Sequence, residues 1–350
     1  MLKVGVDSTK FPGASNKSAG WLLERASEIG LDGVFYRSIL ELSSTLDALE
    51  IQDAMQTADD LGLRVEAGVA KVNPFATPEM PAVRALGEGD YLLGLRKMVL
   101  AATSAGIHEL WTAAANYQFR LPGIYAYDRF RTDVEWSEQL EATAKLLKKI
   151  APILRDAHAH LNLETHEEIT SFEAVRLVEE VGSDVMGITF DAANVLVRCE
   201  DPVAAVNRAA PYIRSSHIRD VALVFTPDGI SRFLRPVGDG ILDWEQMLRP
   251  LLAHDLMLSI EGIIDSRAEM ALQIFDERWQ HGHPDLTLAE AFEVIRLTRA
   301  YETSVASGVG LTHQQLREPV AVGEPLEFIE RSAQNLRSII AEMSAAQADE

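Results

Sequence analysis

Short apolar runs alternate with longer amphipathic runs along this chain, and the alternation repeats eight times between residues 3 and 301. The first unit shows the pattern, with a strand predicted at 3–6 and a helix predicted at 18–29 that ends at Gly30. A glycine directly after the last amphipathic turn is a common end of a helix. The same order of strand, helix and glycine returns at 33–62 and at 63–106.

Five further strands complete the series. They are predicted at 109–113, 161–164, 187–191, 212–217 and 257–261, with helices at 137–156, 171–181, 202–210, 243–254 and 286–301. Most of the strands are apolar throughout, which is typical of parallel strands covered by helices. Eight such units predict a closed (β/α)₈ TIM barrel. The alternative is an open doubly wound sheet, but no glycine-rich phosphate-binding motif follows the first strand.

The barrel is expected to occupy residues 1–303, and a C-terminal helical extension is expected at 304–350. The extension contains a helix-like run at 325–343 and is expected to pack on the barrel or on another subunit, so we predict an oligomer. A polar loop through Pro227 and Gly229 is expected after the seventh strand.

The composition narrows the possible partners. A formal net charge of −21 over 350 residues repels nucleic-acid phosphates and anionic membrane surfaces. The first residues enter a strand without a signal-peptide pattern, and no run is apolar for 18 residues, so a soluble cytoplasmic protein is expected. Cys199 is the only cysteine, which excludes an intramolecular disulfide and a thiolate metal cluster.

Four predicted strands each end in one side chain that can bind a metal ion. Glu164, Asp191 and His217 follow one another at intervals of 27 and 26 residues, about one strand–helix unit, and Glu261 ends the last strand. In a barrel, the carboxyl ends of the strands meet at one mouth. Three carboxylates and one imidazole suit Mn²⁺, with Mg²⁺ or Co²⁺ as substitutes and Zn²⁺ as an alternative. Any one of these residues alone would be read as an ordinary polar strand end.

The chain also resembles a known superfamily. The motifs that carry the resemblance are Asn162-Leu-Glu164, Phe190-Asp191, His217-Ile-Arg-Asp220, Pro236-Val-Gly-Asp-Gly240 followed by Asp243-Trp244, and Ser259-Ile-Glu261. They are similar to those of the xylose isomerase-like barrels of sugar isomerases and epimerases. The resemblance implies that Glu164, Asp191, His217 and Glu261 bind one divalent metal ion.

Ketose 3-epimerases of this superfamily use the two ligand glutamates for proton transfer, so the resemblance implies catalytic roles for Glu164 and Glu261. Those enzymes also have a second histidine three positions after the aspartate. This chain has Asn194 there, and we expect its amide to contact substrate.

His166 lies two residues beyond Glu164, on the same side of an extended chain. A neutral imidazole there is a suitable general base for a carbon-bound proton beside a carbonyl, and the metal ion would stabilise the enolate oxygen. The Glu-Thr-His sequence resembles the larger subunits of bacterial C-glycoside deglycosidases. That resemblance implies removal of the C2 proton of a 3-oxo-glucosyl conjugate, elimination of the aglycone from C1, and a small partner subunit. The alternative is that His166 caps a helix or orients Glu167 or Glu168.

Other residues complete the predicted pocket. Arg219 is expected to bind a substrate oxygen, and Asp220 to orient His217 or to contact a metal-bound water. Trp111, together with Tyr117 and Phe119, is expected to form a flat wall on which a sugar or aryl group stacks. The alternative for Arg219 and Asp220 is an ion pair on the surface. The alternative for the aromatic residues is a place in the core.

Three classes of function therefore stay open. The first is a metal-dependent enzyme that removes a proton beside a sugar carbonyl, either eliminating an aglycone or epimerising a ketose. The second is an endonuclease of abasic sites, which would need more histidine ligands and a basic groove. The third is a silent barrel that serves as a scaffold, although such a barrel would be expected to lose at least one ligand. We favour elimination, with epimerisation as the alternative.

Overall fold

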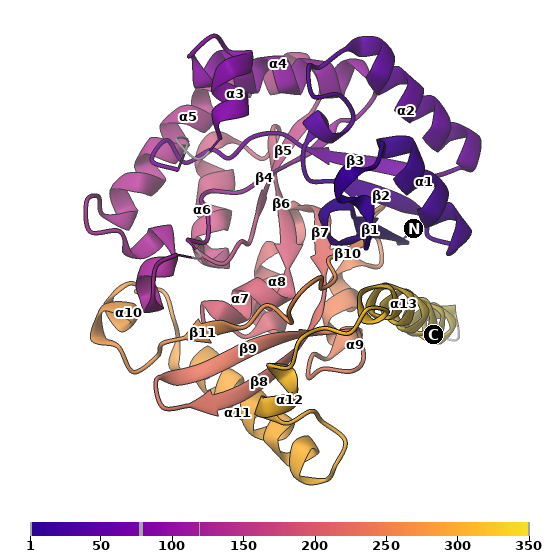
Figure 1. The fold of residues 1–350 in the computed structure, drawn as a ribbon. Coiled ribbons are helices and arrows are strands. Elements are labelled where there is room, and N and C mark those ends of the chain that lie inside the picture. The colour runs from indigo at the N-terminus through magenta and orange to yellow at the C-terminus, as the bar shows by residue number, and fades with distance from the viewer. Residues whose placement is uncertain (1, 77–79, 119, 349–350) are drawn as a thin grey trace.

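Eight parallel strands close into a barrel in the computed structural model, which describes residues 2–76, 80–118 and 120–348. Each strand pairs with its neighbours along the chain, and the last pairs with the first (Figure 1). The predicted TIM barrel is therefore confirmed. The strands are β1 (Lys3–Asp7), β2 (Gly33–Tyr36), β3 (Arg64–Gly68), β4 (Glu109–Thr112), β5 (His160–Glu164), β6 (Met186–Asp191), β7 (Ile213–Ile218) and β10 (Met257–Ile260).

Helices surround the barrel and begin at side chains that accept hydrogen bonds from free backbone N–H groups. Asp47 and Asp90 cap two of them, and Thr170 forms a capping box with Glu173. The apolar faces of the helices pack against the buried strands in one continuous core. The helices are α1 (Ala19–Glu28), α2 (Ala48–Leu61), α3 (Pro81–Leu86), α4 (Tyr91–Ser104), α5 (Trp136–Asp156), α6 (Ser171–Val181), α7 (Ala192–Val197), α8 (Pro202–Ala209) and α9 (Trp244–Leu248).

Side chains fill the inside of the barrel below the mouth. A Cβ atom on Gly5 would lie 2.9 Å from the backbone oxygen of Gly33, and one on Gly33 would lie 2.4 Å from that of Arg64, so glycine is required at both positions. Both would also approach the sulfur of Met257 to 2.5 or 2.6 Å. Met257 occupies the space that they leave and forms a buried cluster with Phe35 and Trp111. The barrel is therefore a packed core that opens only at the carboxyl ends of its strands.

The prediction of a polar loop after the seventh strand is wrong. The structure has a β-hairpin there, β8 (Asp220–Thr226) and β9 (Gly229–Arg235), and β11 (Met270–Leu272) pairs with β9 to make a three-stranded sheet (Figure 1). Pro227 and Asp228 form the two-residue turn and Gly229 begins the second strand, so a Pro-Asp-Gly sequence lies between two apolar runs, which is a pattern that favours a hairpin.

The C-terminal region packs on its own barrel. Helix α10 (Glu277–His281) precedes α11 (Leu288–Ala306), α12 (His313–Leu316) and α13 (Glu324–Ala348), and α13 lies beside β1, β10 and α9. Phe328 and Ile329 of α13 are buried in the main core. Because α11 continues to Ala306, the predicted division at 303 falls inside a helix, and a separate domain stays a prediction.

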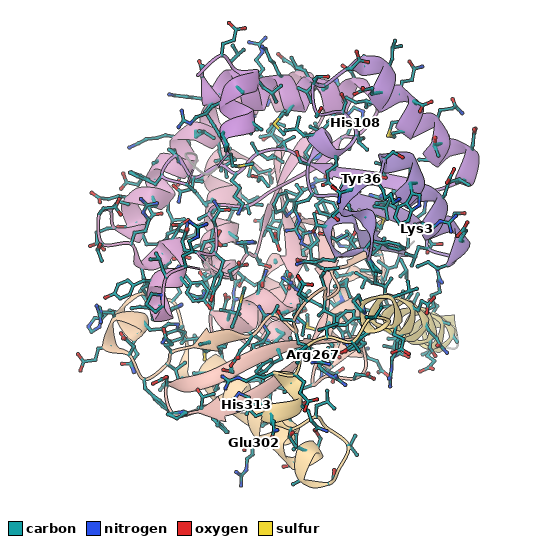
Figure 2. All side chains as sticks on the ribbon, in the orientation of Figure 1. Lys3, Tyr36, His108, Arg267, Glu302 and His313 are labelled. Carbon is teal, nitrogen blue, oxygen red and sulfur yellow. The ribbon has the colours of Figure 1, made fainter. Side chains whose placement is uncertain are left out.

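Arg267 joins this region to the barrel. Its guanidinium donates to the backbone oxygens of Gln315 and Glu318 and pairs with Glu324, so it spans α12 and the start of α13 (Figure 2). No helix in the described part of the chain has the length and apolar character needed to cross a membrane.

Candidate active site

The four predicted ligand residues meet at the mouth of the barrel. Glu164 ends β5, Asp191 ends β6, His217 lies in β7 and Glu261 follows β10 directly. One potential ligand atom from each residue lies within 4.8 Å of the others, and all four side chains are buried. The spacing of strand ends along the sequence thus located a true spatial cluster.

Glu164 is held by three side chains from different elements. Trp111 Nε1 donates to Oε2 at 2.9 Å, and Asn194 Nδ2 donates to Oε1 at 3.3 Å. His217 Nδ1 lies 3.0 Å from the same Oε1. Burial opposes ionisation of Glu164, but nearby positive charge, foremost on His217 and His166, lowers its pKa to about 2. Glu164 is therefore a carboxylate at neutral pH.

Asp191 has two tasks, since it is also the N-cap of α7. Its Oδ1 accepts from the backbone N–H groups of Ala193 and Asn194 at 2.8 and 3.1 Å, which fixes the side chain. Its Oδ2 accepts from Arg219 at 2.5 Å and from the Asn194 amide at 3.2 Å. Asn194 is fully buried and does not line the pocket, and its side chain contacts Glu164, Asp191 and Arg219.

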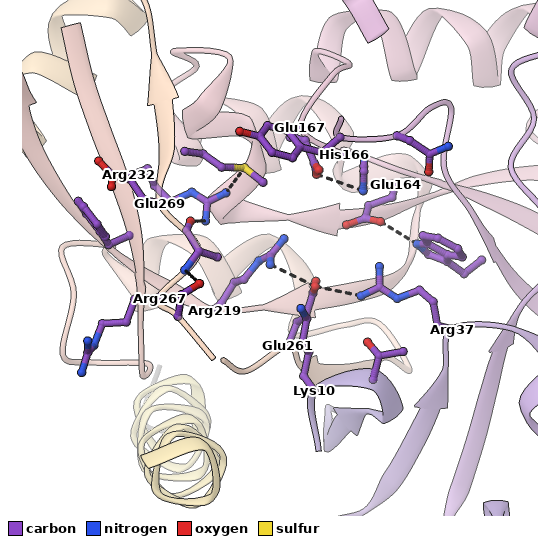
Figure 3. Close-up of a pocket in the computed structure, with 18 of the residues that line it drawn as sticks. Lys10, Arg37, Glu164, His166, Glu167, Arg219, Arg232, Glu261, Arg267 and Glu269 are labelled. Carbon is purple, nitrogen blue, oxygen red and sulfur yellow. Dashed lines mark hydrogen bonds and ion pairs between the residues drawn. The ribbon is translucent and has the colours of Figure 1, made fainter. Parts of the chain in front are cut away.

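Glu261 lies between two arginines, as Figure 3 shows. Its Oε1 is 2.9 Å from Arg37 Nη2 and 3.2 Å from Arg219 Nη1. These guanidiniums outweigh burial and hold the pKa of Glu261 well below its usual range. We did not predict Arg37 from the sequence, although it directly follows the second strand, the kind of position that identified the ligands.

The donor set fits a divalent cation. Opposite ligands of a small divalent ion lie about 4.2 Å apart, which agrees with the spread of the four ligand atoms. Oε2 of Glu261 is buried, has no hydrogen-bond partner and lies 3.5 Å from His217 Nδ1. Burial, together with the charges of Glu261 and Glu164, raises the pKa of Asp191 although Arg219 opposes this shift. A cation bound here would offset the negative charge of the three carboxylates, and Oε2 of Glu261 would be one of its ligands.

His166 belongs to a second buried cluster beside the first. Its Nδ1 contacts Glu168 Oε2, and its Nε2 lies 3.1 Å from Glu167 Oε2. Glu168 is itself held by the backbone N–H of Ala115 at 2.7 Å. This arrangement fixes the orientation of the ring and directs Nε2 toward the pocket wall that Glu167 and His166 share.

The charge of His166 differs from the expected neutral form. Burial alone would lower the pKa of His166, but the carboxylates of Glu167, Glu168 and Glu164 raise it to about 9. The imidazole is therefore protonated at neutral pH in this arrangement. The sequence indicated that His166 lies near Glu164, but not that two adjacent glutamates would enclose its ring.

A pocket of about 720 Å³ opens above these clusters. Its walls come from the barrel mouth, the three-stranded sheet and the segment after α12. Trp111, Tyr117 and Arg219 line it as expected, whereas Phe119 lies outside the described residues. Cys199 lies in the core, and burial raises the pKa of its thiol to about 12, so it is no nucleophile.

Asp220 does not have either of the roles expected for it. Its carboxylate points into the loop that follows β9, where it accepts from the backbone of Val221, Gly238 and Leu242 and from Trp244 Nε1 at 2.8 to 3.1 Å. It contacts neither His217 nor the ligand cluster. The reason is that β8 begins at Asp220, so the chain turns away from the barrel axis there.

The chain is similar to known proteins over most of its length. The family model described as xylose isomerase-like TIM barrel matches residues 23–298. The chain belongs to this family. The resemblance inferred from the strand-end motifs is thereby confirmed for the family and the fold.

Two curated proteins are similar to this chain in sequence. A 3-oxo-isoapionate decarboxylase of Pectobacterium atrosepticum is 25% identical over 239 residues, which cover 65% of this chain and 72% of that protein. The uncharacterized protein YihM of Escherichia coli is 27% identical over 126 residues, or 36% of this chain and 38% of that protein. The chain thus spans well under half of YihM in that alignment.

Solved structures share the fold at low sequence identity. A crystal structure of D-psicose 3-epimerase has a TM-score of 0.57 and 17% identity, covering 87% of this chain and 99% of that one. A xylose isomerase-like barrel from Mycobacterium smegmatis in complex with magnesium has a TM-score of 0.56 and 17% identity, covering 85% and 97%. At these identities the likeness supports the fold alone.

Proposed function

We propose that this protein is a divalent-metal-dependent enzyme that removes a proton beside the carbonyl of a 3-oxo sugar conjugate and eliminates the aglycone, as in cleavage of a 3-oxo-C-glucoside. The observation that carries the proposal is the ring of His166, which Glu168 holds next to the cluster of Glu164, Asp191, His217 and Glu261. A proton-transfer group beside an electrophilic cation site is the minimum that enolisation needs.

Each part of the site has a task in this reaction. The cation, Mn²⁺ by preference, would supply Lewis-acid stabilisation of charge on the 3-oxo oxygen. His166 Nε2 takes the C2 proton once the ring has lost its own proton, and this neutral form is the minor one at neutral pH because the pKa of His166 is about 9. Glu168 keeps the ring oriented. The electron pair left at C2 forms the C1–C2 double bond while the bond from C1 to the aglycone breaks. The protonated imidazole then returns a proton to the aglycone.

The contacts of the two ligand glutamates favour this one-base reaction over epimerisation. Two-base epimerisation needs carboxylate oxygens that are free to accept a proton on both faces of the sugar. Both oxygens of Glu164 already take part in hydrogen bonds, and Oε1 of Glu261 contacts Arg37 and Arg219. The remaining oxygen, Oε2 of Glu261, is the one that would bind the cation. The relative from Pectobacterium is named for action on a 3-oxo sugar acid, which also supports a 3-oxo substrate.

The test is release of aglycone from a 3-oxo-C-glucoside by the Mn²⁺-loaded protein, followed by chromatography with an EDTA-treated control. The assay is run with and without a co-expressed small subunit. We expect His166→Ala to bind Mn²⁺ with unchanged affinity and to lose at least 100-fold in rate, since general acid–base catalysis contributes about 10² to 10⁴. His108→Ala, at an exposed histidine, is the matched control and keeps full activity.

Absence of release under all these conditions would contradict elimination. In that case, uptake of deuterium from solvent into a free ketose would identify the epimerase reaction instead. Full turnover by His166→Ala with Mn²⁺ bound would show that His166 is not the base.

A further inference from the structure

We infer that Arg232 is the binding site for a carboxylate of the substrate, so that the sugar conjugate taken by this pocket is acidic. The inference rests on the proposed function, because it assigns a second contact point within the same pocket. It adds a substrate class that the ligand cluster alone does not specify.

Arg232 lies in β9, the middle strand of the sheet that roofs the pocket. Its side chain is completely buried and lines the pocket wall, as the close-up shows (Figure 3). Two of its nitrogens contact Ala268 O at 3.2 Å and Met270 Sδ at 2.9 Å, and Nε has no hydrogen-bond partner among the residues that the structure describes. Burial, with a contribution from Arg219, lowers the pKa of Arg232 to about 10, so it remains a cation at neutral pH.

The other arginines of this pocket are all neutralised by carboxylates. Arg37 pairs with Asp7 and Glu261, and Arg219 pairs with Asp191 and Glu261. Arg267 and Arg317 pair with glutamates near the rim. Among the described residues, no carboxylate lies within 4.0 Å of Arg232. A charge buried without a partner is unfavourable, so the pocket is electrostatically incomplete at this position.

The charge of the pocket as a whole points the same way. Seven lysines and arginines line it against five glutamates, in a protein whose net charge is −21. Lys71 is half-buried there, and among the described residues its ammonium donates to the Ala115 carbonyl and the Asn116 side chain. Asp7 and Asp191 lie outside this lining and neutralise Arg37 and Arg219, so the positive charge that attracts an anion is that of side chains such as Arg232 and Lys71, which have no ion pair among the described residues.

A carboxylate matches the chemistry of this position best. A guanidinium presents N–H groups in a planar fork that pairs with a carboxylate through two parallel hydrogen bonds. The carbonyl and thioether contacts of Arg232 occupy only two of its five N–H donors. The reacting carbonyl would lie at the ligand cluster and the carboxylate at Arg232, which fixes the substrate at both ends.

The test measures binding of three five-carbon probes to the Mn²⁺-loaded protein by titration calorimetry: D-ribonate, ribitol and ribitol 5-phosphate. We expect ribonate to bind at least tenfold more tightly than ribitol, and we expect this preference to disappear in Arg232→Met. A carboxylate that also chelates the metal does so equally in both proteins, so the comparison isolates Arg232. Arg296→Met, at an exposed arginine of α11, is the matched control and should keep the preference.

Equal ribonate affinities for the wild type and Arg232→Met would overturn the inference, as would equal affinities of the wild type for ribonate and ribitol. If ribitol 5-phosphate binds more tightly than ribonate, the site is specific for a phosphate, and the inference of a carboxylate is wrong. If Arg232→Met is unstable, the ribonate and ribitol affinities of Arg232→Lys and of the wild type still test the inference. If the wild type releases aglycone but shows no preference for ribonate over ribitol, only the anion site is contradicted. If ribonate binding depends on Arg232 but no aglycone is released, only the proposed reaction is contradicted.

Discussion

Replacing Asp220 by asparagine tests whether this buried carboxylate anchors a loop or serves the metal site. Oδ1 accepts from the backbone of Val221 and Leu242 at 2.8 and 3.1 Å. Oδ2 accepts from Gly238 N at 3.0 Å and from Trp244 Nε1 at 2.8 Å. An asparagine keeps one acceptor oxygen and turns an NH₂ group toward two N–H donors, so two of the four hydrogen bonds are lost.

The cost follows from these contacts. A hydrogen bond to a charged acceptor is worth about 1.5 to 3 kcal/mol, so two lost bonds amount to roughly 3 to 6 kcal/mol. Burial raises the pKa of Asp220, which means that the charged form is itself costly and that a neutral amide recovers part of the loss. We expect Asp220→Asn to lower the free energy of unfolding by about 3 kcal/mol.

Urea unfolding followed by circular dichroism measures this loss, and calorimetry measures Mn²⁺ binding by the same variant. Metal affinity should be unchanged. Asp243→Asn, an exposed N-cap that asparagine replaces well, is the control and should change stability by less than about 1 kcal/mol. Unchanged stability with weakened Mn²⁺ binding would refute the reasoning and return Asp220 to the ligand cluster.

Three further outcomes are expected. Asp191→Ala should abolish Mn²⁺ binding in calorimetry, and unchanged affinity would disprove the ligand set. Glu200 is buried, which raises its pKa to about 7, so the folded state holds a proton that the unfolded state loses above about pH 4.5. Denaturation at several pH values should show Glu200→Gln gaining stability over the wild type between pH 4.5 and 7, up to the order of 3 kcal/mol; a pH-independent difference would contradict this. Phe328→Ala should cost about 3 to 5 kcal/mol in urea unfolding, and a loss below 1 kcal/mol would mean that α13 is dispensable.

The sequence by itself determined the order of the eight barrel strands and the four side chains that meet at the barrel mouth. Apolar runs separated by amphipathic runs can bury their surfaces only as parallel strands under helices, and parallel strands end at one edge. This is why Glu164, Asp191, His217 and Glu261 could be predicted to meet from their spacing alone. The same rule would also have found Arg37, and the Pro227-Asp228-Gly229 sequence between two apolar runs would have indicated the hairpin.

Only the tertiary structure decided what each of these side chains does beside its neighbours. Strand periodicity indicates the face on which a residue lies, but a long side chain chooses its partner among elements that are distant in sequence. His166 lies between two carboxylates that keep its ring protonated, and the Asp220 side chain points into the loop after β9. Arg232 is buried without a carboxylate partner among the described residues. Desolvation and charge depend on the whole surroundings of a group, and those surroundings exist only once the barrel has closed.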